Sequence, residues 1–182
     1  MKLKTAISLF AISAIFAIPA LAASDMSKDT YERAKDRIET DYKAAAQRCA
    51  SMSGNAKDIC QAETKGREKA AKAEAYAAYK GTDKAAADAL IVHADAEYAV
   101  AKEKCNDLNG NAKNVCVKEA KAAHTKAKVD AKSNNKVSEV RKDTVEDKRD
   151  ANYDAAKERC DALASDAKTH CLDEVKVRFG KS

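Results

Sequence analysis

The chain has 182 residues, of which 34 are Lys or Arg and 29 are Asp or Glu, so its formal net charge is +5. Opposite charges alternate, as in KDTYERAKDRIETDYK (28–43), which argues against a nucleic-acid partner because such a partner needs a concentrated basic face. Trp is absent and the only proline is Pro19, so no later segment contains this helix breaker.

The N-terminus has the pattern of a secretory signal peptide. Lys2 and Lys4 precede an apolar stretch at 6–18, and Pro19 is followed by the small-residue site Ala20-Leu21-Ala22. We predict a signal peptide over 1–22, cleaved after Ala22, because the apolar stretch is too short to span a bilayer. The mature chain is therefore expected in the periplasm, with secretion as the alternative, and without a stable membrane span.

Beyond Ala22, large apolar side chains are scarce. Three Ile, four Leu, ten Val and one Phe stand beside 34 Ala. Alanine is the strongest helix former, so this composition predicts long helices joined by thin, closely packed seams. A bulky globular core is not expected.

One unit, Tyr-x6-Cys-x10-Cys, occurs three times without gaps. The copies begin at Tyr42, Tyr98 and Tyr153, and their cysteines are Cys49 and Cys60, Cys105 and Cys116, and Cys160 and Cys171. Each second cysteine is followed by x-x-Glu-x-Lys. Repetition at this period indicates a supersecondary unit copied in tandem.

Each unit has the pattern of an antiparallel helical hairpin. In the second copy, Tyr98, Ala101, Cys105 and Leu108 recur at the spacing of one helix face. Asn109-Gly110-Asn111 then suits a helix end followed by a new N-cap. The two cysteines lie symmetrically about this tip, so they would face each other across the hairpin.

The six cysteines allow fifteen pairings. Their equal local spacing favours disulfides 49–60, 105–116 and 160–171, which suit an exported chain. Metal ligation is the competing interpretation, but Cys-x10-Cys lacks the close cysteine pair of a zinc knuckle. No Cys-x-x-Cys redox motif occurs. We therefore expect structural disulfides and neither a metal nor a cofactor.

Two softer breaks divide the units. Lys80-Gly81-Thr82-Asp83 and Ser133-Asn134-Asn135 both read as a helix stop followed by a cap. If both are turns there are six helices; if both are helical, the hairpin tips are the only turns. We expect turns, and hence hairpins over 23–80, 81–135 and 136–182. The predicted fold is all-α: three tandem disulfide-stapled antiparallel hairpins that form an elongated helical bundle.

No residue set predicts catalysis. His93, His124 and His170 are scattered and read as surface histidines, and no nucleophile or phosphate-binding motif occurs in the mature chain. The repeated tyrosines Tyr42, Tyr98 and Tyr153 could form a ligand-stacking row. Packing across each hairpin, below its disulfide, is the favoured interpretation.

The repeat, in its clearest form YAVAKEKCNDLNGNAKNVCVKEAK (98–121), resembles a set of uncharacterised exported proteobacterial proteins. These often carry the automatic label "cell envelope biogenesis protein, TolA-like". The resemblance extends over the mature chain and implies a role at the cell envelope, with no catalytic residues to transfer. TolA itself has an N-terminal transmembrane helix and a compact C-terminal binding domain. This chain shows neither, so the role of TolA is not transferred.

Together these features favour a non-enzymatic periplasmic structural or interaction protein that presents charged helical faces to an envelope protein or polymer. A periplasmic stress-related chaperone or small-ligand-binding protein is the alternative hypothesis.

The pairing of the cysteines is directly testable. Peptide mapping of the exported protein without reduction should yield three linked pairs, 49–60, 105–116 and 160–171. Pairing between repeats, or six free thiols, would contradict the hairpin interpretation.

Overall fold

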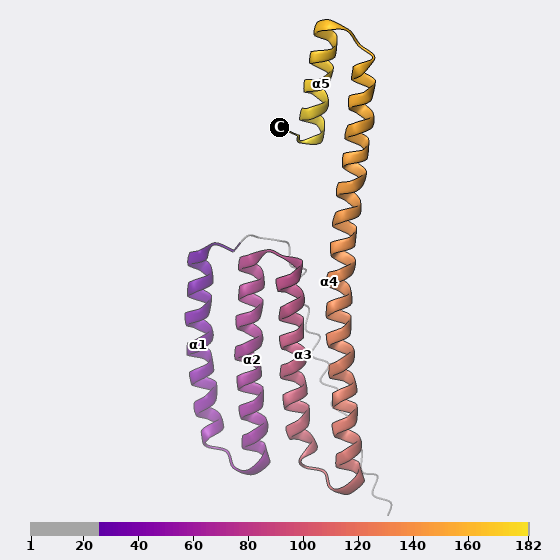
Figure 1. Cartoon of the computed structure of the whole chain (residues 1–182). Helices are drawn as coiled ribbons and strands as arrows, with labels where there is room; N and C mark the ends of the chain where they lie inside the picture. Colours follow the sequence, from indigo (N-terminus) through magenta and orange to yellow (C-terminus); the bar gives the residue numbers. More distant parts are fainter. Residues whose placement is uncertain (1–25, 182) are drawn as a thin grey trace, which may run out of the picture.

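The computed structural model describes residues 26–181, so the predicted signal peptide at 1–22 lies outside the described residues. Five helices follow one another: α1 (Lys28–Ala50), α2 (Gly54–Lys80), α3 (Asp83–Cys105), α4 (Gly110–Asp161) and α5 (Ser165–Phe179). Figure 1 shows α1 to α4 side by side, with α4 continuing far beyond its neighbours and α5 beside its distal part. The predicted all-α fold of stapled hairpins is confirmed.

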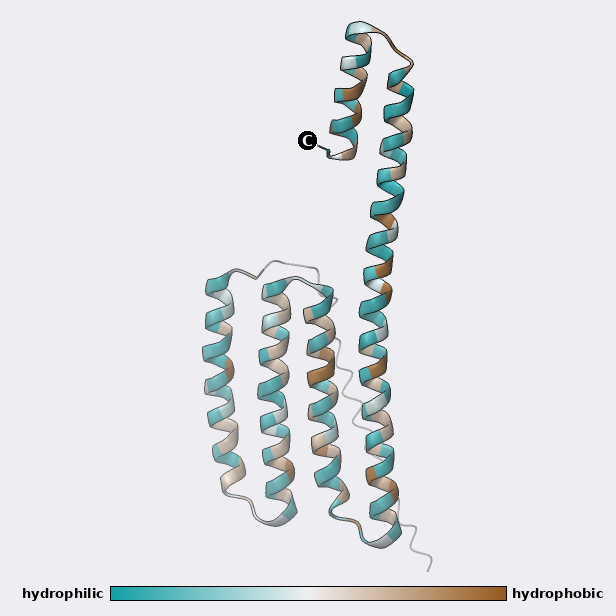
Figure 2. Ribbon diagram, viewed as in Figure 1, coloured by the Kyte–Doolittle hydropathy of each residue, from teal (hydrophilic) through white to brown (hydrophobic). Residues whose placement is uncertain are grey.

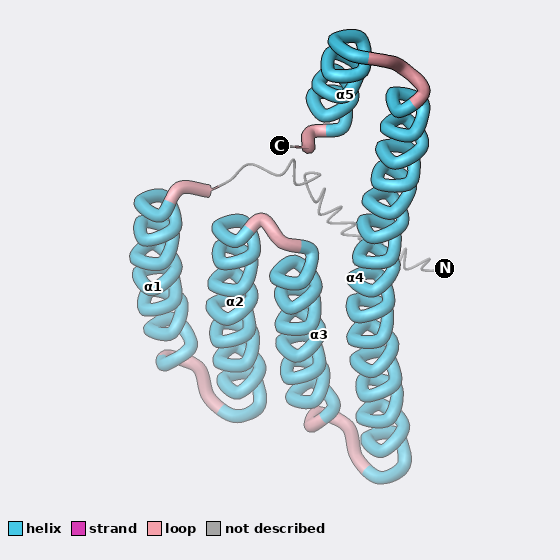
Figure 3. The backbone as a smooth tube through the Cα atoms, turned by 45° about the horizontal axis from the view of Figure 1, so that its top comes forward, coloured by secondary structure: helices cyan, strands magenta, loops and turns pink. Residues whose placement is uncertain are grey.

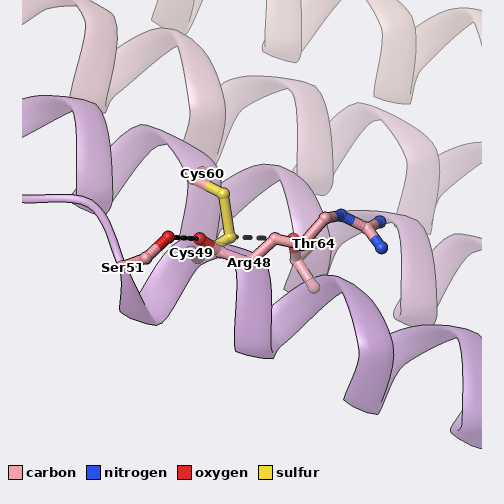
Figure 4. The surroundings of a disulfide bond; sticks show 5 residues. All are labelled: Arg48, Cys49, Ser51, Cys60 and Thr64. Atoms are coloured by element: carbon pink, nitrogen blue, oxygen red, sulfur yellow. Dashed lines mark hydrogen bonds between the residues drawn. A yellow bond between two sulfur atoms is a disulfide. The ribbon is translucent and has the colours of Figure 1, made fainter.

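The three predicted disulfides are all present. Cys49–Cys60, Cys105–Cys116 and Cys160–Cys171 join helix pairs at Cα–Cα distances of 5.5, 5.7 and 5.6 Å. The first cysteine of each pair is completely buried. Around the first disulfide, Cys49 Sγ lies 3.4 Å from Thr64 Oγ1, and the Ser51 hydroxyl donates to the Arg48 carbonyl at the helix end (Figure 4). Each disulfide holds a hairpin together just before its tip.

The helices of this elongated, bundle-like array lie in a single layer, without a common central core. Among the described helices, only those consecutive in the chain pack together: α1 with α2, α2 with α3, α3 with α4, and α4 with α5. Both views of the backbone show the first four as a row (Figures 1 and 3). Every helix of the row therefore keeps two sides free of other helices.

Alanine forms most of the seams between these helices. Apart from the three cysteines and Val175, the buried apolar residues within 26–181 are all alanines: Ala70, Ala75, Ala85, Ala87, Ala89, Ala94 and Ala131. At the α2–α3 crossing, a Cβ atom on Gly66 would lie 3.0 Å from the Cβ of Ala96, closer than packing normally allows. Hydrophilic colours dominate the ribbons in Figure 2. The helices thus pack by close approach, as the composition predicted.

The expected turn at 80–83 is present. Gly81 ends α2 in the left-handed region with φ 60°, and its N–H donates to the Ala77 carbonyl. Thr82 then caps α3 by accepting the N–H of Ala85. Only glycine adopts this backbone conformation without steric cost, which explains the sharp reversal.

The prediction of a turn at 133–135 is wrong, because α4 continues through these residues without a break. Counted from the cysteines, Lys80 corresponds to Lys136 and Lys84 to Glu139. Where the first junction has Gly81-Thr82-Asp83, the second has only Val137-Ser138. A β-branched valine strongly disfavours positive φ, whereas the Asn pair at 134–135 costs a helix little. The second and third hairpins therefore share α4, and five helices replace the expected six.

This continuity leaves part of α4 uncovered. Asp83 at the start of α3 bonds Ser138 and pairs with Lys142 at 2.7 Å, and Lys181 beyond α5 pairs with Asp150 at 2.8 Å. Between these contacts, every residue from 139 to 149 is exposed. The third hairpin thus extends the row end-on, whereas the first two lie side by side.

The third disulfide should contribute more to local stability than the other two. Its helix α5 packs only on α4, and Val175 is the only buried residue of α5. Replacing Cys160 and Cys171 by Ser should weaken α5 docking by about 2–3 kcal/mol. Hydrogen exchange over 165–179 measures this loss. The matched Cys105/Cys116 double variant should perturb its region less, because α3 covers α4 along that hairpin. Unchanged protection in α5 would contradict this view of the staple.

Candidate interaction surfaces

The second repeated tyrosine joins a polar link between α3 and α4. Tyr98 stacks on the ring of His124, with centroids 4.7 Å apart and planes 13° apart. His124 Nε2 lies 2.5 Å from Asp95 Oδ1, and Lys128 Nζ lies 3.1 Å from the same oxygen. The tyrosine thus packs on the returning helix of its own hairpin and covers one side of an inter-helix ion pair.

The other two repeated tyrosines also face the second helix of their hairpins. Tyr153 meets Phe179 of α5 edge-on, with centroids 6.0 Å apart. Tyr42 lines a hollow between α1 and α2 together with Thr64 and Glu68. The repeat places three different residues at the equivalent position of the second helix: Glu68, His124 and Phe179. The repeated tyrosine therefore faces a carboxylate in the first hairpin, an imidazole in the second and an apolar ring in the third. The structure does not bring the three tyrosines together into one site.

Sequence reasoning missed a second aromatic cluster. Tyr31 of α1 stacks on Tyr79 of α2 at 4.9 Å, and Tyr76 lies 6.4 Å from Tyr31. Lys80 Nζ lies within 6 Å of both Tyr76 and Tyr79, at 5.6 and 5.8 Å, a cation–π arrangement. The repeat pattern could not reveal this cluster, because the second copy has Ala87 and Asn135 in place of Tyr31 and Tyr79.

Two of the three histidines link neighbouring helices and are not isolated surface residues. His93 of α3 pairs with Glu74 of α2, and His124, whose side chain is 19% exposed, pairs with Asp95. His170 is exposed and pairs only within α5, with Glu174 at 3.5 Å. No group of three or more His, Cys, Asp or Glu residues within 26–181 could hold a metal ion.

One face of the layer has a shallow apolar groove along the α2–α3 seam. Its volume is about 550 Å³, and small side chains form its floor: Gly66, Ala70, Ala96, Val100 and Ala101. Side chains bridge it at both ends: Glu63 forms an ion pair with Lys104 at 3.4 Å, and Glu74 shares a hydrogen bond with His93 Nε2. The groove can therefore accept a slender apolar group between polar rims.

Two carboxylates at helix contacts are held in the charged form. The pKa of Asp95 is lowered by the hydrogen bond from His124, and Lys128 lowers it further, against partial desolvation. The pKa of Asp83 is lowered by its hydrogen bonds with Lys142 and Ser138. Both groups join α3 to α4, so the positions of these helices depend in part on ionised carboxylates.

The fold is that of a disulfide-stapled all-α repeat array. Comparison of the chain with protein-family models, with curated protein sequences and with solved structures gave no match. Within the described residues, no helix is long and apolar enough to cross a membrane. Three disulfides indicate an oxidising environment of the kind that exported proteins meet.

The Asp95 link predicts a pH-dependent stability. Since its pKa is lowered in the folded protein, Asp95 stabilises the fold above the pKa of an unfolded Asp, about 3.9. This contribution disappears as pH falls through the lowered folded value. Asp95→Asn should therefore reduce stability at pH 7 by up to about 1 kcal/mol, and this difference should vanish in strong acid.

Urea unfolding at several pH values measures this difference. Asp88→Asn is the matched control, because Asp88 pairs only with Lys84 of its own helix. An equal and pH-independent loss in both variants would contradict a role for the inter-helix link.

Proposed function

We propose that this protein is a non-enzymatic structural or interaction protein of the bacterial cell envelope. In this proposal it works in the periplasm, where its helical faces bind an envelope protein or polymer. The observation that carries the proposal is the single-layer architecture, in which each helix packs only on its neighbours in the chain. Such a layer offers more accessible surface than a bundle of the same length.

Three features support this role. The staples resist disruption in an oxidising compartment and hold the faces in place without a large apolar core. Charged residues dominate the exposed positions, so the faces suit polar partners. The resemblance of the 98–121 segment to exported envelope proteins supports the same location.

The apolar groove favours a second candidate function, a chaperone or small-ligand-binding protein. Its floor of alanine, glycine and valine could take an alkyl chain or an extended peptide. Because the groove is open and shallow, we rank this role below that of an interaction protein.

Site-directed photo-crosslinking in the periplasm tests the first proposal. Suitable positions are Tyr76, Leu90 and Val145, whose exposures are 45%, 51% and 67% on different parts of the surface. At least one should crosslink to a discrete envelope component, whereas the buried control position Ala94, 3% exposed, should not. Absence of any specific adduct from all three positions would count against the proposal.

A dye for apolar surface separates the two candidates. An interaction protein with charged faces should give little fluorescence enhancement with such a dye. Strong dye binding that Val100→Lys abolishes, and that the exposed control Val129→Lys on α4 leaves intact, would favour the chaperone or ligand-binding role.

A further inference from the structure

The side of α2 opposite the groove carries a row of exposed lysines: Lys65, Lys69, Lys72 and Lys80. Their spacing places them on one side of the helix, between the residues that face α1 and those that face α3. Lys72 lies near enough to α1 for the charges of Glu39 and Lys35 to affect its pKa. Lys80 lies over the ring of Tyr76 on the same side of α2. The groove side of α2 instead carries Glu63, Arg67 and Glu74.

The lysine row continues across the layer onto α4, which contributes the exposed Lys118, Lys121 and Lys132 and the half-buried Lys128. The bond from Lys128 to Asp95 shows that this side of α4 adjoins the side of α3 that faces away from the groove. Lys84 of α3 lies close enough to Tyr76 of α2 and Glu139 of α4 for both to raise its pKa, so the same sides of the three helices adjoin one another here. We call the eight lysines on α2 and α4 the lysine face.

Six of these eight lysines have no ion-pair partner among the described residues. Among residues 26–181, ion pairs hold Lys72 to Glu68 and Lys128 to Asp95. The other six lysines of the face lie beyond 4 Å from any described carboxylate. The groove on the opposite side is lined by three glutamates, Glu63, Glu74 and Glu97, beside Arg67 and Lys104. The charged residues of the groove are therefore mixed in sign, whereas those of the lysine face on α2 and α4 are positive.

The tandem repeat accounts for part of this arrangement. Lys65 and Lys121 are equivalent positions of the first two copies, and so are Lys72 and Lys128. Because the Gly81 turn places these two copies side by side, repeated lysines from separate hairpins come to lie on one face. An end-on junction would have placed them along a line.

The dimensions of the lysine face indicate the kind of partner that it could bind. From helix rise and helix spacing, the lysines extend roughly 20 Å along the helices and roughly 20 Å across them. They lie on one layer of helices, and both prominent inter-helix hollows are lined by residues of the opposite side, among them Arg67. A two-dimensional set of lysines matches a plane of negative charges, whereas a linear polymer would follow a single row.

We propose that the lysine face docks the four-helix layer onto an anionic phospholipid surface. Each lysine near such a surface raises membrane partitioning about fivefold, so several together give measurable binding. The attraction is electrostatic and is screened by salt, since the Debye length falls to about 3 Å at 1 M. This inference goes beyond the proposed function, because it assigns a lipid partner to one particular face.

Co-sedimentation of the full mature protein with lipid vesicles tests the proposal. Vesicles of phosphatidylcholine and phosphatidylglycerol in equal parts should bind the protein at low salt, whereas pure phosphatidylcholine vesicles should not. The variant Lys69→Glu/Lys118→Glu/Lys121→Glu should bind at least about 100-fold more weakly. The control Arg37→Glu/Arg48→Glu/Arg67→Glu makes the same change of charge around the hollow opposite and should stay within a few-fold of the parent.

Several outcomes would overturn the proposal. Equal losses of vesicle binding in the two triple variants would show that binding depends on net charge and not on the lysine face. Tighter binding to soluble polyphosphate than to anionic vesicles would identify a linear polymer as the partner. If the glutamate variant fails to fold by circular dichroism, the corresponding Lys→Gln variant should still lose about 100-fold. Absence of vesicle binding would refute the lipid surface alone, since the crosslinking experiment on an envelope partner is independent of it.

Discussion

The structure depends on the close approach of alanine-rich helices that share little apolar surface. A methyl group contributes a small area to burial, and hydrophobic stabilisation is roughly proportional to area. In the described residues the buried apolar set is almost entirely alanine and cysteine. The disulfides supply what the seams lack, about 2–3 kcal/mol each for loops of this length. For a chain with so few large side chains, that is a substantial part of typical total stability.

This constraint also shapes the surface. Because each helix is held by covalent staples and thin seams, no helix needs to be surrounded by others, and the row can stay one layer thick. A layer of this kind has two separate faces with different chemistry. One has an alanine-lined groove bridged by the Glu63–Lys104 ion pair, and the other has lysines of which most have no ion-pair partner among the described residues. These two open faces are the basis of the proposed role in binding.

The junction between hairpins determines how the repeats are arranged. Gly81 permits a left-handed backbone, and the chain reverses, so two hairpins lie side by side. At the corresponding junction the chain has Val137 and one residue fewer, and α4 continues. One glycine and one extra residue at the junction thus separate a lateral array from a linear one. Sequence reasoning placed the second junction at 133–135 because Asn residues are frequent helix terminators, whereas in this helix Asn135 donates a hydrogen bond to Glu139 along the surface.

Local features were therefore predictable from the residues alone: the helical class, the hairpin tips, the three disulfides and the Gly81 turn. Each follows from interactions between residues close in sequence, such as the symmetry of two cysteines about a tip. Other features needed the tertiary structure, among them the Tyr98–His124–Asp95 link, the Tyr31–Tyr79 stack and the common face of the lysines. These features depend on which sides of separate helices meet. The sequence does not indicate those sides, because alanine is distributed around the helices and no large apolar residues identify the packed side.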